Sequence, residues 1–401
     1  MEKIFIYYPS HITGGAEFLL KTVADFLKKH VEVHLIDIED GWLSKNLHDV
    51  KKIKITNNLK IKLDEHSVLI TTANLIRKLD EHFTGNFKII AWIVQINNVI
   101  PSLPRIGSIQ YIPILRKLLK VTLLRSEYKN LSSLTSYLHN KNSLYTMDDA
   151  CNDVFEKYYG WRVKNYLPVI LPSNKIFDLP TQKKRRPTNY FRCVWLGRLD
   201  GQFKNPILKR VMLDLSNHAK NSDDHITFTI IGTGPGLSEA KNVASKIKNM
   251  EVIFLGELRG TELFNVLCGH DIGFAMGTSA LEIAACGTPV ILLDASYREV
   301  ASSYKYQWLF ESRGYCIGRS IDNAVDKSMG NKRDINDVLE DITNSEDSIR
   351  YLCHAHVRKF HTIESLESRI LDAIKQTTSD FQFMRESGLL KKPYWYYFRK
   401  I

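Results

Sequence analysis

Short apolar runs alternate with longer amphipathic segments along most of the chain. In the first half, the apolar runs lie at 4–8, 31–36, 68–71 and 89–95, and the amphipathic segments at 16–29 and 74–82. In the second half, apolar runs at 191–196, 227–231, 251–255, 272–276 and 290–293 alternate with amphipathic segments at 206–219, 237–248, 261–268 and 279–286. Strands that alternate with helices are typical of parallel sheets covered on both faces. The pattern predicts an α/β protein with two doubly wound, Rossmann-like domains.

A stretch rich in proline and charge separates the two halves. The chain has 401 residues, and at roughly 150 residues per domain two cores are expected. We expect a first Rossmann-like domain at 1–170, a linker at 171–188 and a second domain at 189–375, helical from 334 onward. A basic, aromatic tail at 376–401 follows, for which packing back on the first domain and contact with a membrane are both open.

Composition narrows the class of protein. With 44% hydrophobic and 25% charged residues, the chain is neither collagen-like, disordered nor a multi-span membrane protein. Its N-terminus lacks a long apolar segment, so we expect a cytoplasmic protein. Its six cysteines lie far apart and without metal-ligand spacing, which predicts reduced, buried thiols and no metal site: Cys151, Cys193, Cys268, Cys286, Cys316 and Cys353.

The net charge of +11 is local. The segments 111–131, 181–187 and 385–401 each carry +4, which together exceed the total by one, so the rest of the chain carries −1. A nucleic-acid-binding protein would show one continuous basic stripe with aromatic residues, and these patches are separate. Because 111–131 and the tail mix cations with apolar or aromatic residues, we expect contact with an anionic membrane surface. The alternative is a solvated helix whose leucines face the core.

Two loops combine glycine with candidate ligand groups. Gly14-Gly15 opens the first helix, where free backbone N–H groups can face an anion, unless the pair is only a tight turn. Gly197 follows a buried strand, and Arg198 and Lys204 follow in the loop before the next helix. Two cations at the carboxyl end of a parallel strand can bind a diphosphate; otherwise they are solvated loop cations.

Two further loops repeat the arrangement of strand, glycine and helix. Gly232-Thr233-Gly234-Pro235-Gly236 is similar to a dinucleotide fingerprint, but Leu237 occupies the position of its last glycine, and the loop follows the second strand of its half. Gly277-Thr278-Ser279 precedes a helix that we expect Thr278 or Ser279 to cap. One turn into it, Glu282 can accept hydrogen bonds from a ribose or merely complement the helix dipole.

In this order and separation, the four motifs resemble the retaining nucleotide-sugar glycosyltransferases of family four, which have the GT-B fold. The resemblance is specific over 190–295 and thinner over 1–165. It implies that Arg198 and Lys204 neutralise the donor diphosphate without a metal or cofactor and that Glu282 binds the ribose. It also implies donor contacts at Gly14, Gly15, Gly197, Gly232, Gly234, Leu258 and Arg259. We further expect the backbone around Gly277, Thr278 and Ser279 to contact the donor.

One position departs from the family pattern. Members usually carry a second glutamate eight residues before the one that matches Glu282, and Phe274 stands there. Other groups must then contact the donor sugar. His11 and Gln95, which the apolar run 89–95 places at a strand end, are further candidates for sugar or acceptor contacts.

The resemblance implies retaining sugar transfer from a nucleotide diphosphate to a glycan or lipid-linked glycan, and we expect a role in bacterial O-antigen or capsule synthesis. The basic segments add the expectation of a peripheral protein on the inner face of the membrane. The alternatives are a sugar-nucleotide epimerase of the same fold and a nucleic-acid-binding protein.

Overall fold

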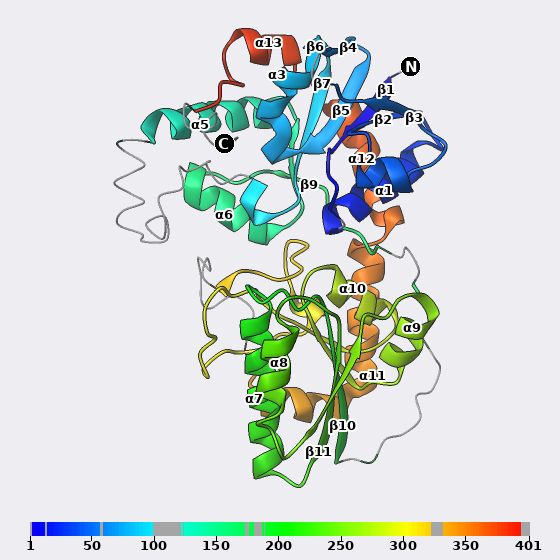
Figure 1. The fold of residues 1–401 in the computed structure, drawn as a ribbon, viewed down its shortest axis with the longest axis vertical. Coiled ribbons are helices and arrows are strands. Elements are labelled where there is room, and N and C mark those ends of the chain that lie inside the picture. Colours follow the sequence, from blue (N-terminus) through cyan, green and yellow to red (C-terminus); the bar gives the residue numbers. More distant parts are fainter. Residues whose placement is uncertain are drawn as a thin grey trace. The chain divides into compact units, whose positions relative to one another are not determined.

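The computed structural model describes residues 2–393 apart from 13, 57–58, 99–121, 123, 173–175, 180–186, 188 and 322–331. The chain forms two compact units, residues 1–168 together with 366–401, and residues 169–365. The predicted class, two Rossmann-like sets of parallel strands and helices with a helical C-terminal region, is confirmed (Figure 1). The basic segment 181–187 falls outside the described residues apart from Pro187, as do 99–121 and 394–401.

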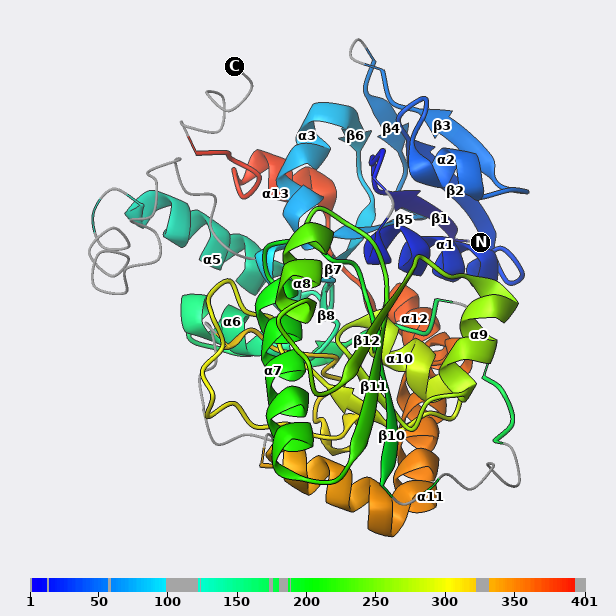
Figure 2. The same cartoon turned by 60° about the horizontal axis from the view of Figure 1, so that its bottom comes forward.

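The first unit is built on a seven-stranded sheet in the order β3-β2-β1-β5-β7-β8-β9, in which every described pairing is parallel. In both views α1 and α12 cover one face, and α5 and α13 cover the other (Figures 1 and 2). Its strands are β1 (Lys3–Tyr7), β2 (Glu32–Asp37), β3 (Lys51–Lys54), β5 (Ser67–Thr72), β7 (Lys88–Ile93), β8 (Leu144–Thr146) and β9 (Asn165–Tyr166), with β4 (Ile61–Leu63) and β6 (Phe83–Gly85) paired separately. Its helices are α1 (Gly15–Leu27), α2 (Trp42–Asn46), α3 (Leu79–His82), α5 (Arg125–Asn140), α6 (Asp149–Tyr159), α12 (Ile363–Gln376, which begins at the end of the second unit) and α13 (Phe381–Glu386).

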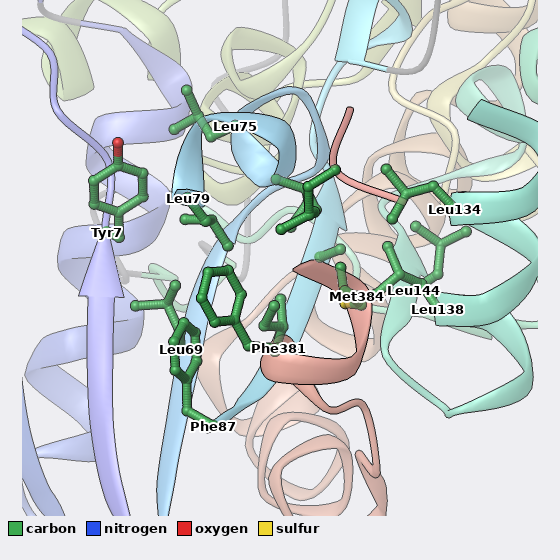
Figure 3. Close-up of a cluster of buried hydrophobic side chains, with 14 of the residues drawn as sticks. Tyr7, Leu69, Leu75, Leu79, Phe87, Leu134, Leu138, Leu144, Phe381 and Met384 are labelled. Atoms are coloured by element: carbon green, nitrogen blue, oxygen red, sulfur yellow. The ribbon is translucent and has the colours of Figure 1, made fainter. Parts of the chain in front are cut away.

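The core of the first unit includes the C-terminal segment. Phe381 and Met384 of α13 are fully buried among residues of β5, β7 and α5 (Figure 3). The Phe381 ring stacks on Phe87 with the centroids 4.3 Å apart. Beyond α13, the Lys391 carbonyl accepts a hydrogen bond from Arg77, and Lys392 pairs with Glu81. The described end of the tail is therefore bound to the first unit.

The second unit has a five-stranded parallel sheet in the order β12-β11-β10-β13-β14. Its central strand β10 ends in the buried run Cys193-Val194-Trp195-Leu196, as expected for a strand covered on both faces. In both views α7 and α8 lie on one face, and α9, α10 and α11 on the other (Figures 1 and 2). The strands are β10 (Tyr190–Leu196), β11 (His225–Ile231), β12 (Glu251–Gly256), β13 (Ile272–Ala275) and β14 (Val290–Leu292); the helices are α7 (Asn205–Asn221), α8 (Leu237–Ala244), α9 (Gly260–Cys268), α10 (Thr278–Ala285) and α11 (Ile335–Phe360).

Two further findings concern the cysteines and membrane-spanning helices. All six cysteines are free thiols, and five are buried, but Cys268 is partly exposed and the prediction was wrong for it. No helix in the described ranges is both long enough and apolar enough to cross a membrane.

Candidate active site

The loops after β10 and β13 leave the second sheet where its strand order reverses. β10 and β13 are neighbours, yet α7 and α10, which follow them, lie on opposite faces (Figure 1). In open α/β sheets, ligands bind at the carboxyl ends of the two strands at such a switch point. Seven of the predicted residues lie in these two loops or in the helix that the second loop opens: Gly197, Arg198, Lys204, Gly277, Thr278, Ser279 and Glu282.

Asp200 folds the loop that carries Lys204. One of its carboxylate oxygens accepts hydrogen bonds from the backbone N–H groups of Gln202 (2.9 Å), Phe203 (3.1 Å) and Lys204 (3.1 Å). Lys204 thereby becomes the N-cap residue of α7, and its Nζ lies against Gly197 at the end of β10. The sequence prediction did not include Asp200 as a functional residue, although an Asp-Gly pair before a helix is a turn signal.

Lys204 and Arg198 are two neighbouring cations without a hydrogen bond or ion pair to a carboxylate in the described part of the chain. Burial lowers the pKa of Lys204, and the nearby charge of Arg198 lowers it further, whereas Asp200 acts in the opposite direction. Arg198 itself is exposed. Because like charges repel, an anion placed between these two side chains would be stabilised by both. A diphosphate carries enough negative charge to interact with both cations.

Gly232 and Gly234 bring the loop after β11 against the loop after β10. The Gly197 N–H donates to the Ile231 carbonyl (3.0 Å), and the Leu199 N–H donates to the Thr233 carbonyl (2.9 Å). A Cβ atom at Gly232 would collide with the Gly197 carbonyl oxygen, and one at Gly234 with that of Leu199. The observed role of these glycines is therefore to let two loop backbones approach closely. Their contact with a nucleotide base stays a prediction.

The N-terminus of α10 is open. Gly277 is its N-cap residue, with a φ of 66° that favours glycine, and no side chain caps the helix. The prediction that Thr278 or Ser279 caps α10 was therefore wrong, since both lie inside its first turn. The backbone N–H groups of this turn have no side-chain acceptor, so they can donate to an anionic ligand.

Glu282 lines a pocket of about 200 Å³ between α9 and α10. Gly260, Thr261 and Phe264 of α9 form the opposite wall, and Phe177 lines it as well. Burial raises the pKa of Glu282 to about 7. Its carboxylate makes no hydrogen bond or ion pair within the described residues, so both oxygens can accept hydrogen bonds from a ligand's hydroxyl groups.

Phe274 contributes nothing to this site. It lies inside β13, pairs with Trp195 of β10 and is completely buried, with its ring against Phe228 and Tyr306. Only Met276 and Gly277 separate β13 from α10. The loop that carries the additional glutamate of the family is short here.

Leu258 and Arg259 follow β12 and precede α9. Arg259 is the N-cap residue of α9, and its exposed guanidinium donates to Glu257 at 2.5 and 2.8 Å. Leu258 is partly buried. These two residues are next to Gly260, which lines the Glu282 pocket.

The predicted residues of the first unit cluster around the start of α1. Gly14 is the N-cap residue of α1, and the space beside Gly15 is open. The buried Glu17 accepts a 2.7 Å hydrogen bond from Ser10. Burial raises the pKa of Tyr8 to about 12, and the nearby charge of Glu17 adds to this shift. Ser10 and Glu17, which the sequence prediction gave no role, therefore hold the loop that Gly14 ends.

His11 and Gln95 are both exposed. His11 donates from Nδ1 to the Asp40 carbonyl at 3.2 Å. Gln95 lies two residues beyond β7, not at the end of the strand as predicted, and its backbone N–H donates to Asn98. The structure does not bring these two side chains into contact with each other.

Metal ligands do not gather in the described ranges. No group of three or more His, Cys, Asp or Glu side chains there is arranged to hold a metal ion. The independence of the reaction from metal ions stays a prediction.

Comparisons with known proteins address the second unit directly. Residues 191–315 match the family model described as Glycosyl transferases group 1. No curated protein sequence matches the chain. The family match supports the predicted resemblance to nucleotide-sugar glycosyltransferases and favours glycosyl transfer over the two alternatives.

Solved structures extend the likeness to both units. Anabaena Alr3699/HepE in complex with UDP and glucose has a TM-score of 0.53 at 12% identity, over 94% of this chain and 99% of that chain. A mutant of S. aureus TarM, in complex with UDP among other ligands, has a TM-score of 0.53 at 10% identity, over 93% of this chain and 100% of that chain. The N-terminal domain of Candida albicans trehalose-6-phosphate phosphatase has a TM-score of 0.53 at 10% identity, over 94% and 97%. At these identities the neighbours establish the fold, which is GT-B.

Proposed function

We propose that the protein transfers a sugar from a nucleotide diphosphate donor to a glycan or lipid-linked glycan, with retention of anomeric configuration and without a metal ion. The observation that carries the proposal is the pair of cations at the switch point. Lys204 is half-buried, the charge of Arg198 acts on it, and neither cation is paired with a carboxylate in the described part of the chain. Removing a cation from water is costly unless an anion compensates it, and a diphosphate would do so.

The chemistry needs stabilisation of a leaving group. The bond between the anomeric carbon and the donor phosphate oxygen breaks, and the nucleotide diphosphate leaves with the electron pair. The acceptor hydroxyl forms the new bond, and its proton passes to the leaving phosphate. Arg198, Lys204 and the open N–H groups of Thr278 and Ser279 would stabilise the charge that develops on the diphosphate, with Gly277 as the residue that opens the helix.

The remaining roles are those that the sequence predicts. Glu282 would accept hydrogen bonds from the ribose hydroxyls, with Leu258 and Arg259 near the base. Gly197, Gly232 and Gly234 would place the loop backbones beside the donor. Gly14 and Gly15 of the first unit would contact the sugar and phosphate, and His11 and Gln95 the sugar or the acceptor.

The acceptor and the cellular site are inferred from charge. Cations mixed with apolar and aromatic residues at 111–131 and 385–401 are suited to an anionic membrane surface. A lipid-linked acceptor would explain why a transferase needs such segments. We therefore propose a peripheral protein on the cytoplasmic face of the membrane that acts in bacterial surface-polysaccharide synthesis.

A thermal-shift panel tests the donor class. The purified protein is heated with UDP, GDP, CDP, dTDP or NAD, each with and without Mg²⁺; UDP comes first because two of the neighbours were solved with it. Stabilisation by one nucleoside diphosphate without Mg²⁺ is expected. A shift with NAD alone would overturn the proposal, and a strict requirement for Mg²⁺ would overturn its metal-free form.

A further inference from the structure

Phe177 forms part of the Glu282 pocket although it belongs to none of the motifs. It lies in the connection between the two halves of the chain, far in sequence from every other residue that lines the pocket. Its ring stacks on Phe264 of α9, with the centroids 3.8 Å apart and an interplanar angle of 29°. A connecting segment thus contributes a wall to the candidate donor site.

Phe177 is anchored independently of that stacking. Its backbone N–H donates to the Ala285 carbonyl at the end of α10 (3.2 Å). Its carbonyl accepts a 2.9 Å hydrogen bond from Nε2 of the buried His354 on α11. The backbone of Phe177 is therefore held by two helices, α10 and α11, while its ring contacts a third, α9.

Helix α9 has few other anchors. Leu267 is its only buried residue, and the Leu267 carbonyl accepts a hydrogen bond from Thr288 (2.8 Å). Both contacts hold the C-terminal end of the helix. The N-terminal half, where Gly260 and Thr261 line the pocket opposite Glu282, has the Phe264 stacking on Phe177 as its aromatic contact.

We propose that Phe177 is a positioning residue that holds the N-terminal half of α9 at a fixed distance from Glu282. It thereby sets the width of the pocket that receives the nucleoside part of the donor. This assignment rests on the proposed function for the identity of the ligand, but the contact of Phe177 with α9 does not depend on it.

The test compares Phe177→Ala with Phe177→Tyr, which keeps the ring. Tyr351→Ala, at an exposed residue of α11, is the matched control for loss of an aromatic side chain. Calorimetry measures binding of UDP, or of the nucleoside diphosphate that the wild type prefers, and of pyrophosphate, which lacks a nucleoside. We expect Phe177→Ala to weaken nucleotide binding about tenfold, the effect of losing one aromatic pair. Pyrophosphate binding should be unchanged in all variants, and Phe177→Tyr should bind the nucleotide like the wild type.

In turnover, Phe177→Ala should raise the KM for the donor and leave kcat close to that of the wild type. Equal nucleotide affinity in Phe177→Ala and wild type would overturn the inference. Equal weakening of nucleotide and pyrophosphate would overturn it too, because that result indicates general damage to the unit.

A second readout needs no ligand. Amide hydrogen exchange in residues 260–264 should be faster in Phe177→Ala than in wild type and unchanged in Tyr351→Ala, and unchanged exchange in Phe177→Ala overturns the inference. If Phe177→Ala does not fold, His354→Ala removes one anchor of Phe177 and should accelerate exchange in the same segment. Absence of nucleotide binding by the wild type, with faster exchange in the variant, would instead contradict the proposed function alone.

Discussion

The backbone N–H of Lys204 donates a 3.1 Å hydrogen bond to the carboxylate of Asp200, four residues earlier in the same loop. The same carboxylate oxygen accepts two further backbone hydrogen bonds within the loop. An acidic residue thus determines where a cation of the candidate site lies. It does so through the backbone and not through an ion pair with the Lys204 side chain.

Replacement of Asp200 tests this arrangement. Asp200→Ala removes the acceptor of three N–H groups, so we expect the loop to loosen and turnover to fall about 10- to 100-fold as Lys204 is misplaced. Asp200→Asn keeps an acceptor and should retain more activity than Asp200→Ala. Steady-state kinetics with the preferred donor measure both. Two variants with wild-type rates would show that the loop needs no such support.

Removal of the cations tests the site itself. Lys204→Ala and Arg198→Ala should each lower turnover by about 10²- to 10³-fold, because each removes charge stabilisation from the leaving diphosphate. Their unfolding midpoints should stay close to that of the wild type. Lys209→Ala, at a lysine of α7 paired with Glu299, is the matched control and should be fully active. Wild-type activity in both site variants would refute the assignment.

Ionisation of Glu282 should lower the stability of the folded protein and, at the same time, supply the carboxylate that binds the nucleotide. Its pKa is raised to about 7 in the folded protein by burial, so the folded state holds a proton that the unfolded chain has already lost above pH 4.5. The stability that this proton contributes is lost as the pH rises through 7. Glu282→Gln, which cannot ionise, should therefore gain stability over the wild type from pH 4.5 upward and reach a constant advantage of up to about 3 kcal/mol above pH 7.

Urea unfolding of the ligand-free protein at pH 4, 6 and 8 measures this difference. The same variant should bind the nucleotide more weakly at pH 8, since it lacks the carboxylate that would accept two ribose hydroxyls. Unchanged nucleotide affinity would mean that Glu282 only complements the dipole of α10. A stability difference that does not depend on pH would contradict the shifted pKa.

Gly232→Ala should disturb the neighbouring loop that carries Arg198 and Lys204. A Cβ atom there collides with the Gly197 carbonyl oxygen, and the φ of 142° is unfavourable for alanine. We expect a loss of about 3 kcal/mol or more in unfolding free energy. Gly388→Ala, with a φ of 73° and open space around it, isolates the backbone strain and should cost about 1 kcal/mol. Thermal or urea unfolding separates the two, and equal losses would exclude the collision.

A truncation tests the membrane proposal. A chain that ends at Pro393 keeps the contacts of Lys391 and Lys392 with the first unit but lacks the aromatic residues 394–398 and the cations Arg399 and Lys400. At about 1 kcal/mol for each cation, binding to vesicles with anionic lipid should weaken at least tenfold. Vesicles of neutral lipid are the control. Undiminished binding to anionic vesicles would show that residues 394–401 do not contribute to membrane binding.

Strands and helices could be predicted because their burial follows from local pattern. The run Cys193–Leu196 indicates a strand covered on both faces, and the structure has one there. The grouping of Arg198 and Lys204 with Glu282 could be proposed because parallel strands end at the same edge of a sheet. The cap of α10 was predicted wrongly, since the positive φ of Gly277 lets the chain enter the helix without a side-chain acceptor.

What could not be predicted depends on contacts between residues distant in sequence. Phe177 is brought to Phe264, Ala285 and His354 by the packing of three helices, and none of these pairs has a sequence signature. The burial that raises the pKa of Glu282 is of the same kind. A motif names the charged group, but its environment is set by the tertiary structure.

The first unit begins earlier in the sequence than the second, but it cannot be the first to complete its core. The first unit buries Phe381 and Met384 in the same core as residues of β5 and β7 (Figure 3), so no N-terminal fragment contains that core complete. The second unit, residues 169–365, is continuous in sequence and is fully synthesised earlier. During translation the candidate nucleotide-binding unit can therefore fold first, and the unit that starts the chain is completed only when α13 has been synthesised. A chain that ends between residues 366 and 380 would contain the second unit whole but lack Phe381 and Met384 from the core of the first.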